Sequence, residues 1–207
     1  MMDDQLPYVI QPMRWEDVPA VMTIERESFP LPWSNYTYRH ELTENTHSHY
    51  IVARPRQALA SKRAWWRQFL WPASPALVGY GGFWLVADEA HISTLAVAPQ
   101  WRGHGLGELL LAAMIEQALS MKAVMVTLEV RISNTVAQRL YTKYGFVITG
   151  TRPRYYRDND EDAHIMTVEA IVSDEYKRQL AELQATLQAR LRSDGTERIG
   201  QKTTARL

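Results

Sequence analysis

The sequence predicts one α/β domain built on a mixed β-sheet. In the second half of the 207-residue chain, short apolar segments typical of strands alternate with segments of helical periodicity. Residues 123–130 are apolar and rich in β-branched side chains, which is typical of a strand buried on both faces. The length suffices to bury a sizeable core.

The first half of the chain is predicted to begin with a strand and two helices. In order, its elements are a strand at 8–13, a helix at 15–28, a helix at 34–42 and strands at 49–53 and 77–86. Apolar residues at helical spacing predict the first helix, and Ser34 is a residue type that caps the second. Gly79, Gly81 and Gly82 in the last strand indicate a bulge or a close backbone approach.

The second half adds further strand–helix units. The predicted elements are a strand at 91–97, a helix at 106–121, a strand at 123–130, a helix at 135–143 and strands at 145–149 and 163–171. Beyond Ser173, one more helix is predicted, because leucines recur on one side of it at helical spacing. These are Leu180, Leu183, Leu187 and Leu191. The polar tail from Ser193 is expected to be disordered. We therefore divide the chain into a domain at 1–172 and a C-terminal helix and tail at 173–207.

Composition excludes several classes of function. The formal net charge is zero, so the whole molecule is not a general polyanion binder. The chain has no cysteine, which excludes disulfides, thiolate metal sites and a cysteine nucleophile. We find no secretion signal and no apolar run of about 20 residues, so a soluble, cytoplasmic protein is expected. The six histidines show no metal-ligand spacing, so we expect no metal and treat them as packed or solvated.

The segment from Gln100 to Gly107 follows a strand and begins a helix. Glycines let the backbone approach a ligand closely, and free amides at a helix N-terminus attract anions, so a phosphate is the expected ligand. A Walker A loop is excluded because Glu108 follows Gly107, and in a dinucleotide fingerprint the third glycine would come one residue later. A side chain at Gly105 is expected to fill the space that the phosphates need. A glycine-rich turn without a ligand stays open.

Two later segments narrow these alternatives. Residues 128–134 read LEVRISN and residues 140–146 read LYTKYGF. With the glycine turn, they resemble the GNAT acetyltransferases, and more narrowly the subfamily that acetylates a ribosomal-protein N-terminal alanine. The resemblance includes residues 29–34 and 154–156 and covers about 8–172 without the insertion. The sequence departs from the family at Glu108, a position where Arg, Lys or a small residue is often found. It implies the α/β (α+β) GNAT fold, a mixed central β-sheet flanked by helices on both faces.

The resemblance also implies a set of site residues. Coenzyme contacts are expected from Leu95, Ala96, Val97, Arg102, Gly103, His104, Gly105, Leu106, Gly107, Glu108 and Asn134. In this scheme Leu95 to Val97 pair with the pantetheine arm, and the Val97 amide stabilises an oxyanion. Glu129 is the candidate base, through a water, and Tyr141 the candidate acid. The acceptor is expected to contact Phe29, Trp33, Arg154, Tyr155 and Tyr156, the last three from a loop over the entrance.

Each of these roles has a structural alternative. Glu129 could position an amine without moving a proton, Tyr141 could be a core tyrosine, and Asn134 could only cap a helix. The aromatic residues at the entrance could be plain packing.

The activity that the resemblance implies is acetyl-CoA-dependent acetylation of a protein α-amine, with the N-terminal alanine of ribosomal protein S18 as acceptor. Two alternatives remain: acetylation of a lysine or small amine, and a non-catalytic acyl-CoA-binding module. The presence of both Glu129 and Tyr141 argues against the module.

The insertion at 54–75 combines basic and aromatic side chains without an acid. Together with one interleaved leucine, they are Arg54, Arg56, Lys62, Arg63, Trp65, Trp66, Arg67, Phe69, Leu70 and Trp71. Such a patch can contact ribosomal RNA or an anionic membrane surface. The alternative is a long hairpin whose aromatic residues pack on the domain and whose arginines are solvated.

Overall fold

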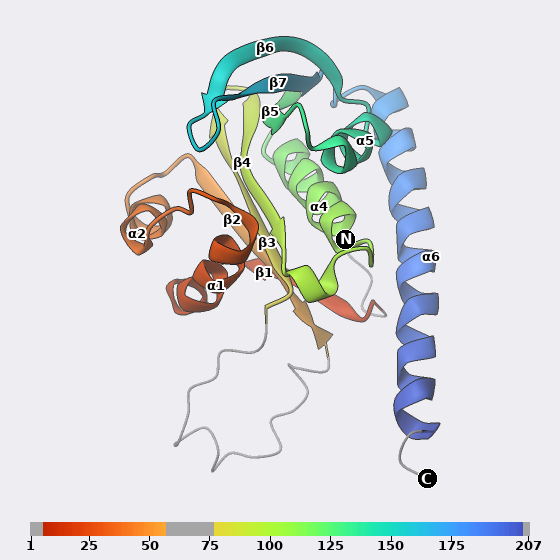
Figure 1. The fold of residues 1–207 in the computed structure, drawn as a ribbon. Helices are drawn as coiled ribbons and strands as arrows, with labels where there is room; N and C mark the ends of the chain where they lie inside the picture. Colours follow the sequence, from red (N-terminus) through yellow and green to blue (C-terminus); the bar gives the residue numbers. More distant parts are fainter. Residues whose placement is uncertain (1–5, 57–76, 205–207) are drawn as a thin grey trace.

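A seven-stranded mixed sheet in the order β1-β2-β3-β4-β5-β7-β6 runs through the computed structural model (Figure 1). The structure describes residues 6–56 and 77–204, with side chains described as far as residue 193. The strands are β1 Tyr8–Pro12, β2 Ser48–Pro55, β3 Gly79–Val86, β4 Glu89–Val97, β5 Met125–Arg131, β6 Val147–Tyr156 and β7 Glu161–Val168. The helical elements are η1 Trp15–Asp17, α1 Val18–Ser28, α2 Asn35–Thr43, η3 Pro99–Trp101, α4 Leu106–Ser120, α5 Thr135–Lys143 and α6 Asp174–Thr204.

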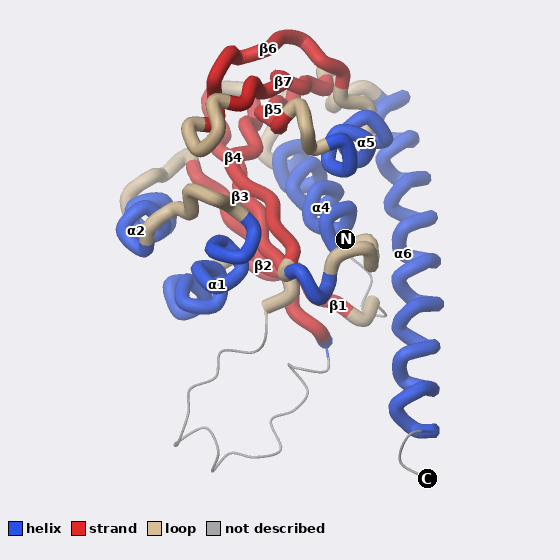
Figure 2. The backbone as a smooth tube through the Cα atoms, in the orientation of Figure 1, coloured by secondary structure: helices blue, strands red, loops and turns tan. Residues whose placement is uncertain are grey.

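Helices cover both faces of this sheet, as the sequence predicts (Figure 2). Helices α1 and α2 pack on one face, where Val21, Tyr38 and Tyr80 belong to one buried cluster. Helix α4 packs on the other face, and α6 lies alongside α4 and contributes Leu187 and Leu191 to that second, larger core. The predicted leucine stripe of α6 is therefore the side that packs on the domain.

One parallel pair makes the sheet mixed. Strands β4 and β5 run parallel, and every other neighbouring pair is antiparallel. The predicted irregularity in β3 is present, because its register with β4 shifts between Gly82 and Phe83. A Cβ atom at Gly82 would lie 2.2 Å from the Tyr50 ring, so only glycine fits this close approach.

Several predicted boundaries are wrong. The helix expected at 15–28 begins with the 3₁₀ turn η1, and α1 starts at Val18, next to Pro19. Strand β6 extends to Tyr156, well past the predicted end at 149, so Arg154, Tyr155 and Tyr156 end a strand. Helix α6 continues past Ser193 to Thr204, so the residues expected to form the disordered tail are helical as far as this position.

Two residues of the predicted basic patch, one in β2 and one just after it, have partners within the described structure. Arg54 is 6% exposed in β2 and forms an ion pair with buried Asp17 of η1. The Arg56 side chain donates a hydrogen bond to the Leu6 carbonyl at 2.8 Å. The expectation that no acid offsets these arginines is therefore wrong for Arg54, whose partner precedes it by 37 residues.

The rest of the patch, from Lys62 to Trp71, lies outside the described residues. RNA or membrane contact by residues 57–75 therefore stays a prediction. Within the described ranges, no helix combines the length and apolar character needed to cross a membrane.

Candidate active site

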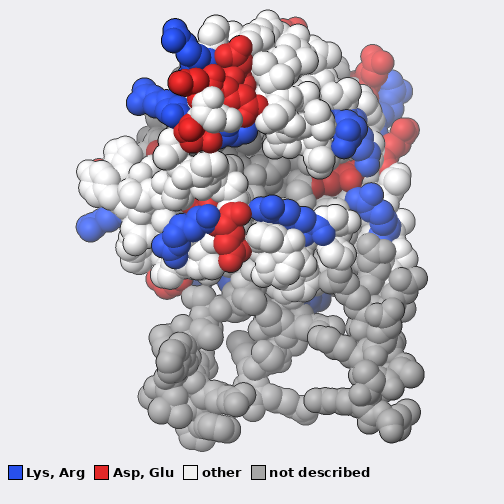
Figure 3. All heavy atoms as spheres, in the orientation of Figure 1, with Lys and Arg blue, Asp and Glu red and all other residues white. Residues whose placement is uncertain are grey.

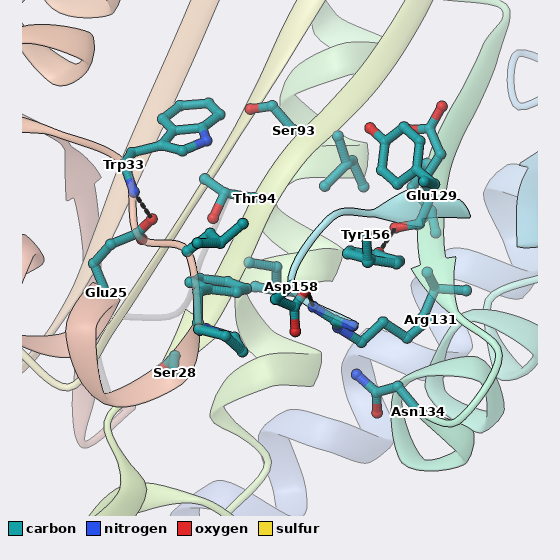
Figure 4. A pocket seen from close by; sticks show the side chains of 18 of the residues that line it. Glu25, Ser28, Trp33, Ser93, Thr94, Glu129, Arg131, Asn134, Tyr156 and Asp158 are labelled. Carbon is teal, nitrogen blue, oxygen red and sulfur yellow. Dashed lines mark hydrogen bonds and ion pairs between the residues drawn. The ribbon is translucent and has the colours of Figure 1, made fainter. Parts of the chain in front are cut away.

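Strands β4 and β5 separate in the middle of the sheet. Their parallel pairing covers only Glu89–Ile92 of β4 and Met125–Leu128 of β5, although both strands continue. Beyond this point a cleft of about 530 Å³ opens, lined by the α1–α2 loop, the diverging strands, α5 and the end of β6. Figure 4 shows Trp33 and Glu25 on one side of it and Glu129, Tyr156 and Arg131 on the other.

The β4 edge that borders the cleft offers hydrogen-bonding groups to a ligand. Ala98 donates its N–H to the Val78 carbonyl at the β3 side. Successive backbone groups of a strand point to opposite edges, so the Val97 N–H points away from β3. Thr94 Oγ1 is buried at the cleft and finds no partner among the described residues. The chain therefore presents an open strand edge with polar groups along it.

Glu129 is the centre of an ionic cluster on the opposite strand. Its Oε2 lies 2.6 Å from His91 Nε2, and its Oε1 lies 3.1 Å from Arg152 Nη2. Burial raises the pKa of the Glu129 carboxyl, but the hydrogen bond from His91 and the charges of His91 and Arg152 outweigh it, so the net pKa is lowered. Glu129 is thus an ionised carboxylate that is 6% exposed.

Tyr141, predicted as the acid, lies in the wall of the same cleft. Helix α5 carries it, and 8% of the residue is exposed. Burial raises the pKa of its phenol far above the usual 10.0, with a smaller contribution from Tyr156. The group therefore carries its proton throughout the physiological pH range.

Aromatic side chains form the two walls expected at the entrance. Trp33 stacks on Trp84 with ring centroids 6.5 Å apart, and Trp84 meets the His91 ring edge-on at 5.7 Å. On the other wall Tyr155 packs edge-on against Tyr156, and the Arg131 guanidinium lies 3.9 Å from the Tyr156 ring centroid. These stacks fix the side chains that border the cleft.

Glu25 fixes the α1–α2 loop that carries Phe29 and Trp33. Its carboxylate accepts hydrogen bonds from the Trp33 N–H at 2.9 Å and from the Tyr38 hydroxyl at 3.1 Å. Burial raises the pKa of Glu25 above its usual value despite these bonds. Phe29 lines the cleft together with Trp33, whereas Arg154 is not among the lining residues, and its N–H donates to Asp162 Oδ1 at 2.8 Å.

The glycine turn has the backbone that the sequence predicts. Gly103 and Gly105 have φ angles of +78° and +76°, which favour glycine, and α4 begins at the next residue, Leu106. A Cβ atom at Gly103 would meet open space. At Gly105 it would lie 2.7 Å from Arg190 Nη2 and 3.3 Å from Leu187 Cδ1, so a side chain at Gly105 would meet α6.

Two of the predicted coenzyme contacts already have partners within the chain. Arg102 donates from Nε to the Val97 carbonyl at 3.0 Å and from Nη2 to Ser28 Oγ at 3.0 Å, which joins the turn to β4 and α1. Asn134 caps α5 by accepting the Ala137 N–H at 3.1 Å, and it also lines the cleft. The capping alternative for Asn134 is therefore correct, without excluding a ligand contact.

His91 is one of the site residues that the sequence does not reveal. The sequence predicts a packed or solvated histidine at this position, because no metal-ligand spacing includes it. In the sheet, His91 lies opposite Thr127, two residues from Glu129 along β5. Only the pairing of β4 with β5 brings the two side chains together, so no local signal in the sequence could identify the pair.

Charges of both signs border the cleft. Figure 3 shows acidic and basic side chains side by side over the tip of the β6–β7 hairpin, and a hollow between this tip and the end of α1. Arg131 pairs there with Asp158 at 2.6 Å and with Glu161 at 2.9 Å. Ion pairs within the chain thus stabilise the entrance, whose surface carries both positive and negative charges.

The chain matches the model of the acetyltransferase (GNAT) family over residues 18–146. It is 40% identical over 159 residues, 77% of this chain and 93% of the relative, to a Bacillus subtilis protein provisionally named ribosomal protein bS18-alanine N-acetyltransferase. It is 30% identical over 172 residues, 80% of this chain and 95% of the relative, to the N-alpha-acetyltransferase RimI of Mycobacterium tuberculosis. The crystal structure of the ribosomal-protein-S18-alanine N-acetyltransferase from Escherichia coli superposes with a TM-score of 0.65 at 26% identity, covering 79% of this chain and 94% of that one. A cleft between two diverging parallel strands, a glycine turn before α4 and these matches lead to one conclusion: the chain belongs to the GNAT acetyltransferase family.

Proposed function

We propose that this protein acetylates the α-amine at a protein N-terminus and that the N-terminal alanine of ribosomal protein S18 is its acceptor. One observation carries the proposal: the open edge of β4 borders a cleft that contains the His91–Glu129 pair. The names of the relatives from B. subtilis and E. coli support the choice of acceptor, since both specify the alanine of this ribosomal protein.

The described residues fit acetyl-CoA, the cosubstrate that the GNAT family uses. When bound, it supplies an acetyl thioester whose leaving group is a thiolate. The backbone of Leu95, Ala96 and Val97 can receive an amide-containing arm as an added strand. The amides of the turn from Arg102 to Glu108 can receive a diphosphate at the N-terminus of α4. Asn134 is proposed as a further contact from the start of α5.

Glu129 and His91 are proposed to take the proton of the acceptor amine as a pair. The carboxylate orients the imidazole through Nε2, as an acidic residue orients the histidine of hydrolase triads. An α-amine has a pKa of about 7.7–8.0, whereas the lysine amine has a pKa of about 10.4. The pair therefore needs to be less basic to deprotonate an α-amine than to deprotonate a lysine. This favours a protein N-terminus as the acceptor.

Tyr141 and the Val97 amide are proposed to complete the reaction site. A buried phenol that keeps its proton can donate it to a departing thiolate. The Val97 N–H is proposed as the donor to a developing oxyanion, a contribution of roughly 3 kcal/mol in other enzymes. Phe29, Trp33, Tyr155 and Tyr156 are proposed to contact the acceptor peptide, with Arg154 at the rim.

Substitution of the pair tests the chemistry. Glu129→Gln should lower kcat about a hundredfold or more, the usual size of a general-base contribution, while the affinity for CoA stays near the wild-type value. His91→Gln should lower kcat similarly, and Tyr141→Phe more mildly. Glu169→Gln, an exposed control that removes the same charge, should leave both quantities unchanged. Near-wild-type turnover in all three site variants would refute proton transfer by these residues.

A competition between peptides tests the acceptor. A peptide that begins Ala-Arg, the start expected for mature S18, should be acetylated in preference to one with a blocked α-amine and a free lysine. Mass spectrometry of an equimolar mixture measures the ratio. Equal labelling of the two peptides would indicate a lysine acetyltransferase instead.

A further inference from the structure

Glu108 places a buried carboxylate at the proposed diphosphate site. It lies in the first turn of α4, immediately after the glycine turn, and is 7% exposed. A carboxylate there is stabilised by the helix dipole, but it also repels an anionic ligand at the same amides. The position therefore needs a compensating charge if a diphosphate is to bind.

Three donors surround this carboxylate, one from α5, one from the residue that follows α5 and one from α6. Lys143 Nζ of α5 lies 2.5 Å from Oε1, and the neighbouring Tyr144 hydroxyl donates to the same oxygen at 3.2 Å. Arg190 Nη2 of α6 lies 2.9 Å from Oε2. Helix α6 begins after residue 146, where the match to the family model ends, so Arg190 is supplied from outside the matched region.

Arg190 is held against the glycine turn by the packing of α6. Leu187 and Leu191, which flank it on the helix, are 2% and 1% exposed. A Cβ atom at Gly105 would lie 3.3 Å from Leu187 and 2.7 Å from Arg190 Nη2. Figure 1 shows α6 running beside α4 at this turn. The two leucines therefore anchor α6 beside the turn, while the Arg190 side chain itself is 49% exposed.

We propose that Arg190 is a positioning residue for coenzyme binding: it neutralises Glu108 and so keeps the N-terminus of α4 attractive to the diphosphate of CoA. This inference rests on the proposed function, since it assumes that CoA binds at the turn. With one carboxylate and two cations, Glu108, Lys143 and Arg190 carry a net charge of +1. Without Arg190 the net charge is zero, and without both Glu108 and Arg190 it returns to +1.

Calorimetric titration with CoA tests this charge balance directly. Arg190→Met should weaken CoA binding about threefold to tenfold, the range expected of a half-exposed charge near a helix terminus. Arg190→Lys, which keeps the charge, should stay close to the wild type. The double variant Glu108→Gln/Arg190→Met should recover most of the lost affinity. Arg178→Met removes an exposed positive charge of the same helix and should change nothing.

Titration with 3′-dephospho-CoA tests which phosphate group is involved, because this ligand keeps the diphosphate and lacks the 3′-phosphate. The Arg190→Met loss should be the same for both ligands; a loss confined to CoA would overturn the proposal. An unchanged affinity in Arg190→Met, or a loss that Glu108→Gln fails to reverse, would overturn it as well. If the wild-type protein itself does not bind CoA, the proposed function fails, which separates the two results.

Discussion

At the scale of single residues, the ionisation of Glu129 decides which group limits proton removal. The net pKa of Glu129 is lowered below its usual 4.5 by His91 and Arg152, despite burial. The group is therefore a carboxylate at every pH above that value. A free α-amine has a pKa of about 7.7–8.0, so near neutrality the amine changes its protonation state and Glu129 does not.

This difference predicts the pH dependence of the reaction. For an acceptor with a free α-amine, kcat/KM should rise with an apparent pKa of about 7.7–8.0, the value of the amine itself. Glu129→Gln should lower the whole profile without moving its acid limb. Rates measured from pH 5.5 to 9 for both proteins check this. A limb that disappears in the variant would mean that it reports the Glu129–His91 pair and not the amine.

At the scale of elements, the glycine turn and α6 constrain each other. Gly103 and Gly105 have similar positive φ angles, but only Gly105 faces α6. Gly103→Ala should therefore lower the free energy of unfolding by about 1 kcal/mol, from backbone strain alone. Gly105→Ala should cost about 2 kcal/mol, because Arg190 and Leu187 must also shift. Urea denaturation of the matched pair measures the difference, and equal losses would show that α6 does not press on the turn.

Local patterns of the sequence predict where helices and strands lie better than they predict which strands pair and which side chains meet. The helix at 106–121 and the strand at 123–130 follow from periodicity and nearly match α4 and β5. The separation of β4 from β5 after Ile92 has no local signal, and the His91–Glu129 contact depends on it. Strand β6 continues through Gly150 and Pro153, past the predicted end at 149. It is an edge strand with register shifts, where proline is tolerated.

At the scale of the whole molecule, the site is distributed over segments that are far apart in the chain. The cleft needs the α1–α2 loop, both diverging strands, α5 and the β6–β7 hairpin in place together. The glycine turn is backed by α6, beyond the residues that match the family model. A ligand that bridges these parts binds the folded state and not the unfolded chain.

Coenzyme binding should therefore raise the stability of the entire fold. At a free CoA concentration one hundred times its Kd, linkage predicts about 2.7 kcal/mol of added stability. For a chain of this size, each kcal/mol shifts Tm by about 2–4 °C, so the melting temperature should rise by roughly 5–10 °C. Scanning calorimetry with and without CoA measures the shift, and pantetheine at the same concentration is the control, since it lacks the diphosphate. If a saturating amount of CoA leaves Tm unchanged, the ligand does not bind at the folded turn and cleft. If pantetheine raises Tm as much as CoA does, the β4 edge alone supplies the binding free energy.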